Sequence, residues 1–541
     1  MDFRPSSILR WLFDPQHGDR NRLLPRWLFL RALGLIYLSA FYSLLFQIRG
    51  LIGPNGILPA AEYLRAVTNS IGFARFWYTP TLLWFSTGNH MLMAICWAGL
   101  LASVLLTANI FPRGMLLICF ICFLSFVSAA SDFSGYQSDG MLLEAGFISI
   151  FLAPPGFRTG LAPNSPPIRA SIFLLLWEWF RIYFESGIAK IASGDPQWRH
   201  FTAMDEYYQN GPLPTWVGWY VQHLAHWFHA ATAFGTLALE LVLVWMFFLP
   251  RRFRIICFFI VTPWQTGIIL TANYTFLNYL VLALGIFLLD DRFLAPFIAR
   301  FVSQSWRAQL SHSTQTVTEA PASQEAAGPN WQQTWARHLA TVKRALTAVM
   351  FIWLFYSSTV LLLMMLWPAA PFPYAPVAAL QPFRVADRYG LFAVMTRGRY
   401  EIEFQGSNDG ENWIAFSFRY KPQNPHEAPR IYAPYQPRFD WNLWFASLGH
   451  WRSNPIVPRT EERLLEGSPD VLALFAGNPF PQPPRQIRVL LWQYWFTSMQ
   501  AKREQGLWWH RQLLGNYAPT LARANGRIIG IEWPPELPPR Q

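Results

Sequence analysis

The feature that most constrains this chain is a series of nine apolar runs in its first two thirds. A helix needs about 20 apolar residues to cross a bilayer, and some of the runs are shorter. The weakest, 141–154, fits a tilted or re-entrant piece as well as a full crossing. The sequence therefore predicts a multi-pass α-helical membrane domain with eight or nine spans. The runs are 27–48, 82–108, 114–130, 141–154, 170–191, 230–249, 255–271, 276–289 and 345–367.

The charge composition agrees with a membrane protein. Only 14% of the 541 residues are charged, whereas a soluble domain has about a quarter. The net charge of +12 comes from basic residues scattered between the apolar runs. No basic stripe or nucleic-acid motif is present, which excludes a nucleic-acid partner. The predicted partner at this level is the lipid bilayer.

The distribution of Lys and Arg predicts the orientation. With nine spans, the segments on the side of the N-terminus carry about 17 Lys and Arg, and the opposite loops carry about 5. Cytoplasmic loops are the ones enriched in these residues. We therefore expect a cytoplasmic N-terminus, and everything after residue 367 on the other side of the membrane.

Four segments follow from these patterns. Residues 1–300 form the multi-span membrane domain, and 345–367 form the last transmembrane helix. Between them, 301–344 is a flexible cytoplasmic linker, because its Ser, Thr, Gln, Ala and Pro cannot bury a core. Residues 368–541 form a water-facing, mostly β domain, lumenal or periplasmic.

The water-facing domain has a clear hairpin pattern. Tyr400, Ile402 and Phe404 alternate with polar residues, and a second alternation begins at 414. Asp409-Gly410 supplies the turn between them. We expect a β-sandwich-like domain, with helices near 440–448 and 469–475.

Charged residues stand inside the apolar runs. Glu178, Arg181 and Glu185 share one face of a helix by their spacing. Charges in a membrane pair with one another or face a cavity. An ion triad that fixes helix packing is the favoured interpretation, and a substrate or proton site is the alternative. Three further residues are expected to join this polar cluster: Glu144, Lys190 and Glu240.

The chain offers little evidence for enzyme chemistry. His223, His226 and His229 are weak metal candidates, because no Cys or carboxylate stands at a matching spacing. No hydrolase, ATPase, zincin or dinucleotide-binding motif occurs. The sequence predicts no metal, no cofactor and no catalytic residue, and it sets no oligomeric state.

Several short runs of the sequence form distinctive motifs. A Ser-Gly…Lys span end is followed by a Gly-Asp-Pro-x-Trp turn at 194–198, and Asn-Tyr-x-Phe-x-Asn stands at 273–278. The late-chain motifs are the more specific ones. They are Tyr-Gly-Leu-Phe at 389–392, Gly-Ser-x-Asp-Gly-x-x-Trp at 406–413, Gln-Pro-Arg-Phe-Asp-Trp-x-x-Trp at 436–444 and Asn-Pro-Phe-Pro at 478–481.

Together these motifs resemble the lipase maturation factor family. The resemblance implies a multi-pass protein of the endoplasmic reticulum membrane. The Arg- and Trp-rich composition is also typical of a bacterial protein, for which the membrane would be the inner membrane. The resemblance also implies a chaperone-like role in folding and assembling client lipases, rather than catalysis. The matching residues would then be client-facing or fold-defining, and for the Trp residues of 441–444 a place in the domain core is the favoured alternative. These residues are Asp195, Trp198, Asn273, Tyr389, Gly390, Asp409, Gly410, Trp413, Arg438, Asp440, Trp441 and Trp444.

A fainter similarity, at the level of the spans, links the chain to the membrane domain of vitamin K-dependent carboxylases. It implies an alternative function as an intramembrane enzyme or small-molecule carrier. The polar residues around Arg181 and Lys190 would be its site.

Overall fold

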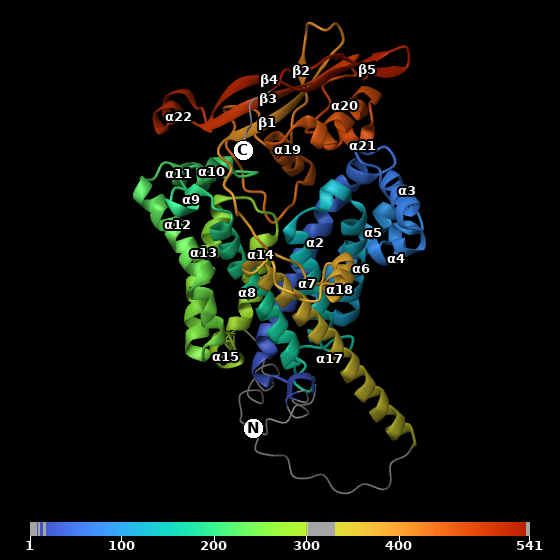
Figure 1. Cartoon of the computed structure of the whole chain (residues 1–541), viewed down its shortest axis with the longest axis vertical. Coiled ribbons are helices and arrows are strands. Elements are labelled where there is room, and N and C mark those ends of the chain that lie inside the picture. Colours follow the sequence, from blue (N-terminus) through green and yellow to red (C-terminus); the bar gives the residue numbers. More distant parts are fainter. Residues whose placement is uncertain (1–7, 9–10, 15–17, 299, 301–330, 537–541) are drawn as a thin grey trace.

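The computed structural model describes residues 8, 11–14, 18–298, 300 and 331–536. Long helices lie side by side in a bundle, and a sheet domain covers one end of it (Figure 1). The first long helix begins at the opposite end of the bundle. The helices of the bundle are α2 (Leu23–Ile52), α5 (Asn89–Thr107), α6 (Pro112–Ala129), α7 (Gln137–Leu152), α8 (Arg169–Ala192), α12 (His226–Leu241), α13 (Arg251–Thr271), the shorter α14 (Leu277–Gly285), and α17 (Trp331–Leu366).

Short helices join the long ones and gather mainly near the sheet domain. They satisfy backbone groups in connections that would otherwise be irregular. These elements are α3 (Ala60–Ile71), α4 (Arg75–Tyr78), α9 (Pro196–Arg199), α10 (Tyr207–Asn210), α11 (Trp216–Gln222), α15 (Asp291–Ile298) and α18 (Ala375–Leu380).

The number of membrane-crossing helices differs from the prediction. Within the described residues, six helices are long and apolar enough to cross a bilayer, and one shorter apolar helix covers Leu277–Leu288. The predicted eight or nine spans are therefore not confirmed. The shortfall includes α7, with only 16 residues, and α8, which carries charged residues along its length. Most side chains of both helices are buried, so neighbouring helices rather than lipid surround them.

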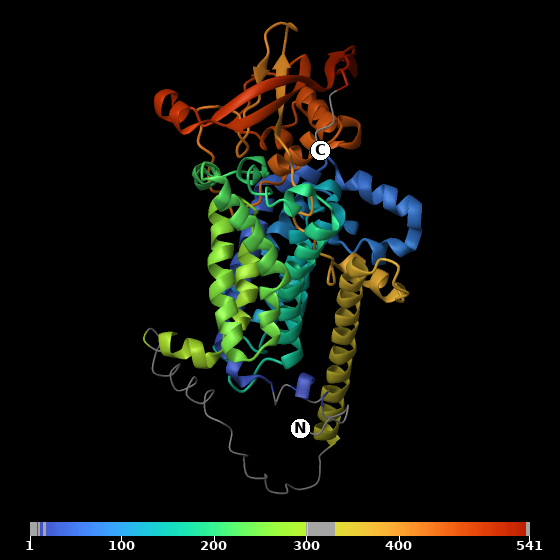
Figure 2. The ribbon, with the colours of Figure 1, turned by 60° about the vertical axis from the view of Figure 1, so that its left-hand side comes forward.

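The last long helix begins earlier than expected. Its first residue is Trp331, so 331–344, which the sequence assigns to the linker, are helical. The rest of the predicted linker, 301–330, lies outside the described residues. In Figure 2, α17 runs along the outside of the bundle.

The C-terminal domain contains one antiparallel sheet of five strands in the order β2-β1-β3-β4-β5. The predicted hairpin is confirmed, with Gln405 opposite Ala415 and Gly406 opposite Ile414. The strands are β1 (Arg399–Ser407), β2 (Ile414–Ala415), β3 (Gln486–Phe496), β4 (Trp509–Ala524) and β5 (Arg527–Glu532).

The expectation of a β-sandwich is wrong, because the described residues form a single sheet covered by helices. Helices α19 (Arg438–Leu448) and α20 (Ile456–Glu466) contact the sheet, and α21 (Pro469–Leu472) follows them. Phe439 and Leu443 are spaced one helical turn apart and are both buried. This 3.6-residue period favours helix over a second layer of strands. The helices expected near 440–448 and 469–475 correspond to α19 and α21.

One apolar core extends from the bundle into the sheet domain. A single cluster of buried side chains includes Leu33 of α2, Leu175 of α8, Ile402 of β1 and Val489 of β3. The two domains therefore share packed surface, which fixes their relative position.

Candidate functional site

A segment of the C-terminal region returns into the helix bundle. Residues 387–397, here called the inserted segment, connect α18 to β1 without regular secondary structure. Backbone groups of such a segment need hydrogen-bond partners when they are buried. The bundle supplies these partners from α7, α8 and the loop at α9.

Arg181 of α8 holds the start of the inserted segment. Its buried guanidinium donates to the carboxylate of Glu144 on α7 and to the carbonyl oxygen of Asp387 at 2.7 Å. Glu185, one turn further along α8, lies 3.8 Å from the same guanidinium. An arginine offers five donors in a rigid fork, which suits a contact with several acceptors at once.

The two carboxylates that neutralise Arg181 also bind the inserted segment. The backbone N–H of Tyr389 donates to Glu185 Oε2 at 2.6 Å, and the Tyr389 hydroxyl donates to Glu144 Oε2 at 2.7 Å. The N–H of Gly390 donates to Gln137 Oε1 at 2.9 Å. Charges in the bundle and a loop from the distant C-terminal region thus satisfy each other.

Lys190 and Glu240 form a second, neighbouring cluster. The Lys190 ammonium lies 2.9 Å from Glu240 and donates to the carbonyl oxygen of Leu391 at 3.0 Å. The N–H of Leu391 donates to Ser186 Oγ at 3.3 Å. The polar residues expected to form one cluster therefore divide into two.

Glu178 differs from the other charged residues of α8. Its side chain is fully buried. Neither carboxylate oxygen has a hydrogen-bond partner among the described residues. The predicted triad within α8 is therefore incomplete. Arg181 pairs with Glu185 of α8 and with Glu144 of α7, and not with Glu178.

Asp195 and Trp198 hold the end of the inserted segment. Asp195 caps α9 by accepting from the N–H of Gln197 at 3.0 Å, and it accepts from the N–H of Met395 at 2.7 Å. The indole N–H of Trp198 donates to the carbonyl oxygen of Phe392 at 3.0 Å. Both residues of the Gly-Asp-Pro-x-Trp turn therefore act as anchors for a distant part of the chain.

A buried ion pair makes a further link between the domains. Both terminal nitrogens of Arg438 on α19 donate to the carboxylate of Asp139 on α7, each at 2.8 Å. Arg438 also donates to the carbonyl oxygen of Phe133 at 2.7 Å. Bidentate pairs of this kind combine strength with a fixed geometry.

Asp440 stands two residues further along α19 and has a different role. Its Oδ1 accepts from the N–H groups of Tyr420 and Lys421, each at 3.3 Å. Burial raises its pKa from 3.8 to about 6, although the charge of Lys421 and these hydrogen bonds oppose the rise. Arg438, two residues earlier, binds Asp139 instead.

Asn273 fastens the proline-rich connection that precedes α19. Its Nδ2 donates to the carbonyl oxygen of Arg430 at 2.8 Å, and its Oδ1 accepts from the N–H groups of Tyr432 and Ala433 at 2.6 and 3.0 Å. One side-chain amide thus makes the backbone hydrogen bonds that a neighbouring strand would otherwise make to this segment.

The hairpin motif has a local function. Gly410 has a φ of +82°, which glycine adopts without strain. Asp409 accepts hydrogen bonds from the side chain and N–H of Asn412 and from the N–H of Glu411, and these bonds hold its pKa below the usual range. The Trp413 indole donates to the Gly410 carbonyl at 3.1 Å. These residues define the turn.

The tryptophans of α19 belong to the core. Trp441 and Trp444 are only 8% and 7% exposed. Trp441 packs against Tyr136 and Tyr274 of the bundle, with ring centroids 5.8 and 6.3 Å apart. Phe445 is 47% exposed and is the accessible aromatic residue of this motif.

The three histidines do not converge. His223 contacts the carbonyl oxygens of Trp219 and Thr497, His226 lies 2.9 Å from Asp205, and His229 contacts the carbonyl of Leu224. In the part of the chain that the structure describes, no group of three or more His, Cys, Asp or Glu side chains is placed to hold a metal.

Sequence reasoning missed the partners of these anchors. Asp139, Gln137 and Asp387 contact residues that are far away in the sequence. For Gln137 and Asp139 the available signal was the polar stretch 137–140 that directly precedes the weak apolar run at 141–154. The buried charges bind the backbone of a chain segment that is distant in the sequence.

Comparisons with known proteins agree with this architecture. Residues 24–296 match the family described as "Lipase maturation factor transmembrane domain", and 385–519 match "Lipase maturation factor C-terminal domain". The chain is 31% identical to human lipase maturation factor 2, covering 92% of this chain and 83% of the relative. It is 30% identical to bovine lipase maturation factor 1, covering 94% and 91%. No solved structure matches the chain.

Proposed function

Because the chain belongs to the lipase maturation factor family, we propose that it is a membrane-anchored factor that helps exported lipases reach their active fold. Similarity to the relatives extends through both the bundle and the sheet domain. The alternative function as an intramembrane enzyme or carrier is not favoured. Arg181 and its carboxylates are buried against the inserted segment, so they are not open to a substrate.

The observation that carries this proposal is the fastening of the sheet domain onto the bundle. Arg181, Asp195, Asn273 and Arg438 each bind across the two domains. A domain held in this way has a fixed height above the membrane, at the end of the bundle opposite the start of α2 (Figure 1). Such a platform suits clients that fold beside the membrane after translocation.

The proposed location follows from the loop charges. Their bias favours a cytoplasmic N-terminus, so the sheet domain would face the lumen of the endoplasmic reticulum, or the periplasm in a bacterium. The client would then meet the sheet domain as it emerges on that side.

We assign client contact to the β5 edge of the sheet. Ile529, Ile531 and Trp533 alternate along this strand and its end, and are 45%, 48% and 64% exposed. An edge strand offers unpaired backbone groups to another chain, and the exposed side chains add apolar contact. Incompletely folded clients present both kinds of surface.

The test removes the gene and measures the activity of each secreted lipase per amount of lipase protein. The wild-type chain should restore the activity lost on deletion, and the double variant Ile529→Asp/Ile531→Asp should not. Ile414→Asp, at the opposite edge of the same sheet and 49% exposed, is the matched control and should restore it. Unchanged specific activity of every secreted lipase after deletion would refute the proposed function.

A further inference from the structure

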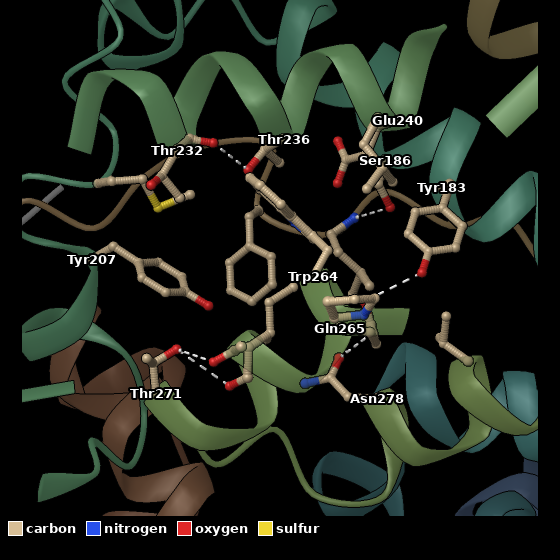
Figure 3. Close-up of a pocket in the computed structure, with 18 of the residues that line it drawn as sticks. Tyr183, Ser186, Tyr207, Thr232, Thr236, Glu240, Trp264, Gln265, Thr271 and Asn278 are labelled. Carbon is tan, nitrogen blue, oxygen red and sulfur yellow. Dashed lines mark hydrogen bonds between the residues drawn. The ribbon is translucent and has the colours of Figure 1, made fainter. Parts of the chain in front are cut away.

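A cavity in the membrane bundle lies beside the cluster of Lys190 and Glu240. It has a volume of about 600 Å³ and lies between α8, α12, α13 and α14. Figure 3 shows Thr232, Thr236 and Glu240 of α12 facing Trp264 and Gln265 of α13 across it. Its size is within the range of small-molecule sites.

The cavity reaches the lipid-facing surface through α13. Phe259 and Ile260 line it and are also 56% and 37% exposed. Pro263 and Gly267 line it as well and are exposed. Only 17% of the apolar part of α13 is buried, so this helix borders the bilayer. A molecule in the bilayer can therefore enter from the side.

The length of the cavity suits an acyl chain. Its wall on α13 runs from Phe259 to Thr271, which spans about 18 Å at 1.5 Å per residue. Apolar side chains form most of the wall, including Leu239, Ile268 and Val281. Water molecules would find few hydrogen-bond partners in such a space, whereas a hydrocarbon chain can fill it without leaving any polar group unpaired.

One end of the cavity is charged. Lys190 and Glu240 both line it. An ammonium carries three donors, and the hydrogen bonds of Lys190 go to Glu240 Oε1 and the Leu391 carbonyl. The ammonium also lies 2.9 Å from Glu240 Oε2 and 5.2 Å from the centroid of the Trp198 ring, so a ligand oxygen would compete with these two contacts for the third donor. Among the uncharged polar residues of the lining, Tyr183, Gln265 and Asn278 are hydrogen-bonded to one another at 3.3 and 2.8 Å. The hydroxyls of Thr232, Thr236 and Thr271 donate to backbone carbonyls of their own helices. The polar end of a ligand therefore belongs at Lys190.

We propose that this cavity binds a single-chain amphiphile from the bilayer, an acyl chain whose carboxyl or ester oxygen accepts a hydrogen bond from Lys190. Leu391 and Phe392 of the inserted segment also line the cavity. The bound chain thus touches the segment that connects the bundle to the sheet domain. This inference goes beyond lipase maturation and is tested without any lipase.

The experiment uses the purified full-length protein and two probes, a photoreactive fatty acid and the monoglyceride of the same acid. Mass spectrometry should locate cross-links in peptides covering 232–240 and 259–268. Excess unlabelled lipid should displace the probe from these peptides but not from the lipid-facing helix α5. If only the fatty acid labels these peptides, the ligand is a free fatty acid. If both probes label them, the site recognises the acyl oxygen that the acid and the ester share.

A variant pair makes the test specific. An added side chain at Gly267 meets no atom within 4 Å, so Gly267→Phe should fill the entrance without disturbing α13 and reduce labelling about tenfold, a loss of ~1.4 kcal/mol in binding. Thr266→Phe, exposed beside it and outside the cavity lining, should label as the wild type does. Equal labelling of both variants would overturn the proposal. So would even labelling of all lipid-facing helices in the wild type, a result that needs no variant.

Discussion

At the scale of residues, this protein uses buried charges as connectors. Arg181, Arg399 and Arg438 are each fully buried, and each donates to carbonyl oxygens of another part of the chain as well as to a carboxylate. A buried ion pair adds little stability compared with apolar residues of similar volume, but breaking one is costly. In this protein, each buried ion pair fixes the relative position of two segments that are far apart in the sequence.

The Arg438–Asp139 pair gives a direct test of this view. Arg438→Leu should destabilise the protein by about 3–5 kcal/mol, because Asp139 stays buried without a counter-charge. The double variant Arg438→Leu/Asp139→Leu should lose much less, because no unpaired charge remains. Thermal unfolding of the solubilised protein, followed by tryptophan fluorescence, measures both. Equal losses in the single and double variants would contradict this role.

Asp440 predicts a pH dependence of stability. Its pKa rises from 3.8 to about 6 on folding, so the folded state holds the proton more tightly than the unfolded state does. The stability contributed by the protonated form is complete below pH 3.8 and is lost as the pH rises through about 6. This difference in pKa between the folded and unfolded states corresponds to at most about 3 kcal/mol in the free energy of unfolding.

Asp440→Asn is the matching variant, because it keeps an oxygen that accepts from Tyr420 and Lys421. We expect the unfolding temperature of the wild type to decline between about pH 4 and pH 7, and the decline to be smaller in Asp440→Asn. The same slope in both proteins would assign the pH dependence to other groups.

At the scale of elements, the inserted segment is held by side chains rather than by secondary structure. Its partners Glu144, Arg181, Glu185 and Asp195 come from α7, α8 and the turn before α9. A segment of this kind opens more readily than a helix or strand when one of its partners is removed. The sheet domain would then lose its connection to the centre of the bundle.

Arg181→Leu should therefore increase protease cleavage within residues 387–397 and lower the amount of protein in the membrane. The cause is the loss of the donor to Asp387, together with unpaired charge on Glu144 and Glu185. Arg181→Lys keeps the charge and should give a smaller increase in cleavage. Limited proteolysis with mass spectrometry locates the cut, and resistance equal to that of the wild type would exclude this role for Arg181.

Local patterns were sufficient to predict some elements but not their contacts. Alternation from Tyr400 to Phe404 and the Asp409-Gly410 turn predict the hairpin, because its two strands are neighbours in sequence. Nothing near Tyr389 indicates that its hydroxyl binds Glu144, 245 residues away. The second layer of the sheet domain does not follow from local patterns either, since helices and strands can both cover an apolar sheet face. The charges of α8 were found because charge in an apolar run is visible locally.

At the scale of the whole molecule, the arrangement predicts a two-sided topology. The sheet domain lies at the opposite end of the bundle from the start of α2 (Figure 1), and the loop charges favour a cytoplasmic N-terminus. Alkaline phosphatase fused after residue 541 should be active, because it folds only outside the cytoplasm. The same reporter placed within 301–330 should be inactive. Activity in the reverse pattern would refute both the orientation and the proposed meeting with exported clients.

The inserted segment also sets an order of assembly. Helices α7 and α8 are synthesised before residues 387–397. Until that segment is made, Arg181, Glu185 and Lys190 lack the backbone carbonyl and amide groups that they bind in the folded protein. A chain that ends after α17 therefore keeps the ion pairs of Arg181 and Lys190 but lacks the hydrogen bonds that these residues and Glu185 form with residues 387–391. The membrane bundle of this maturation factor therefore reaches its complete set of hydrogen bonds only after the C-terminal third of the chain has been made.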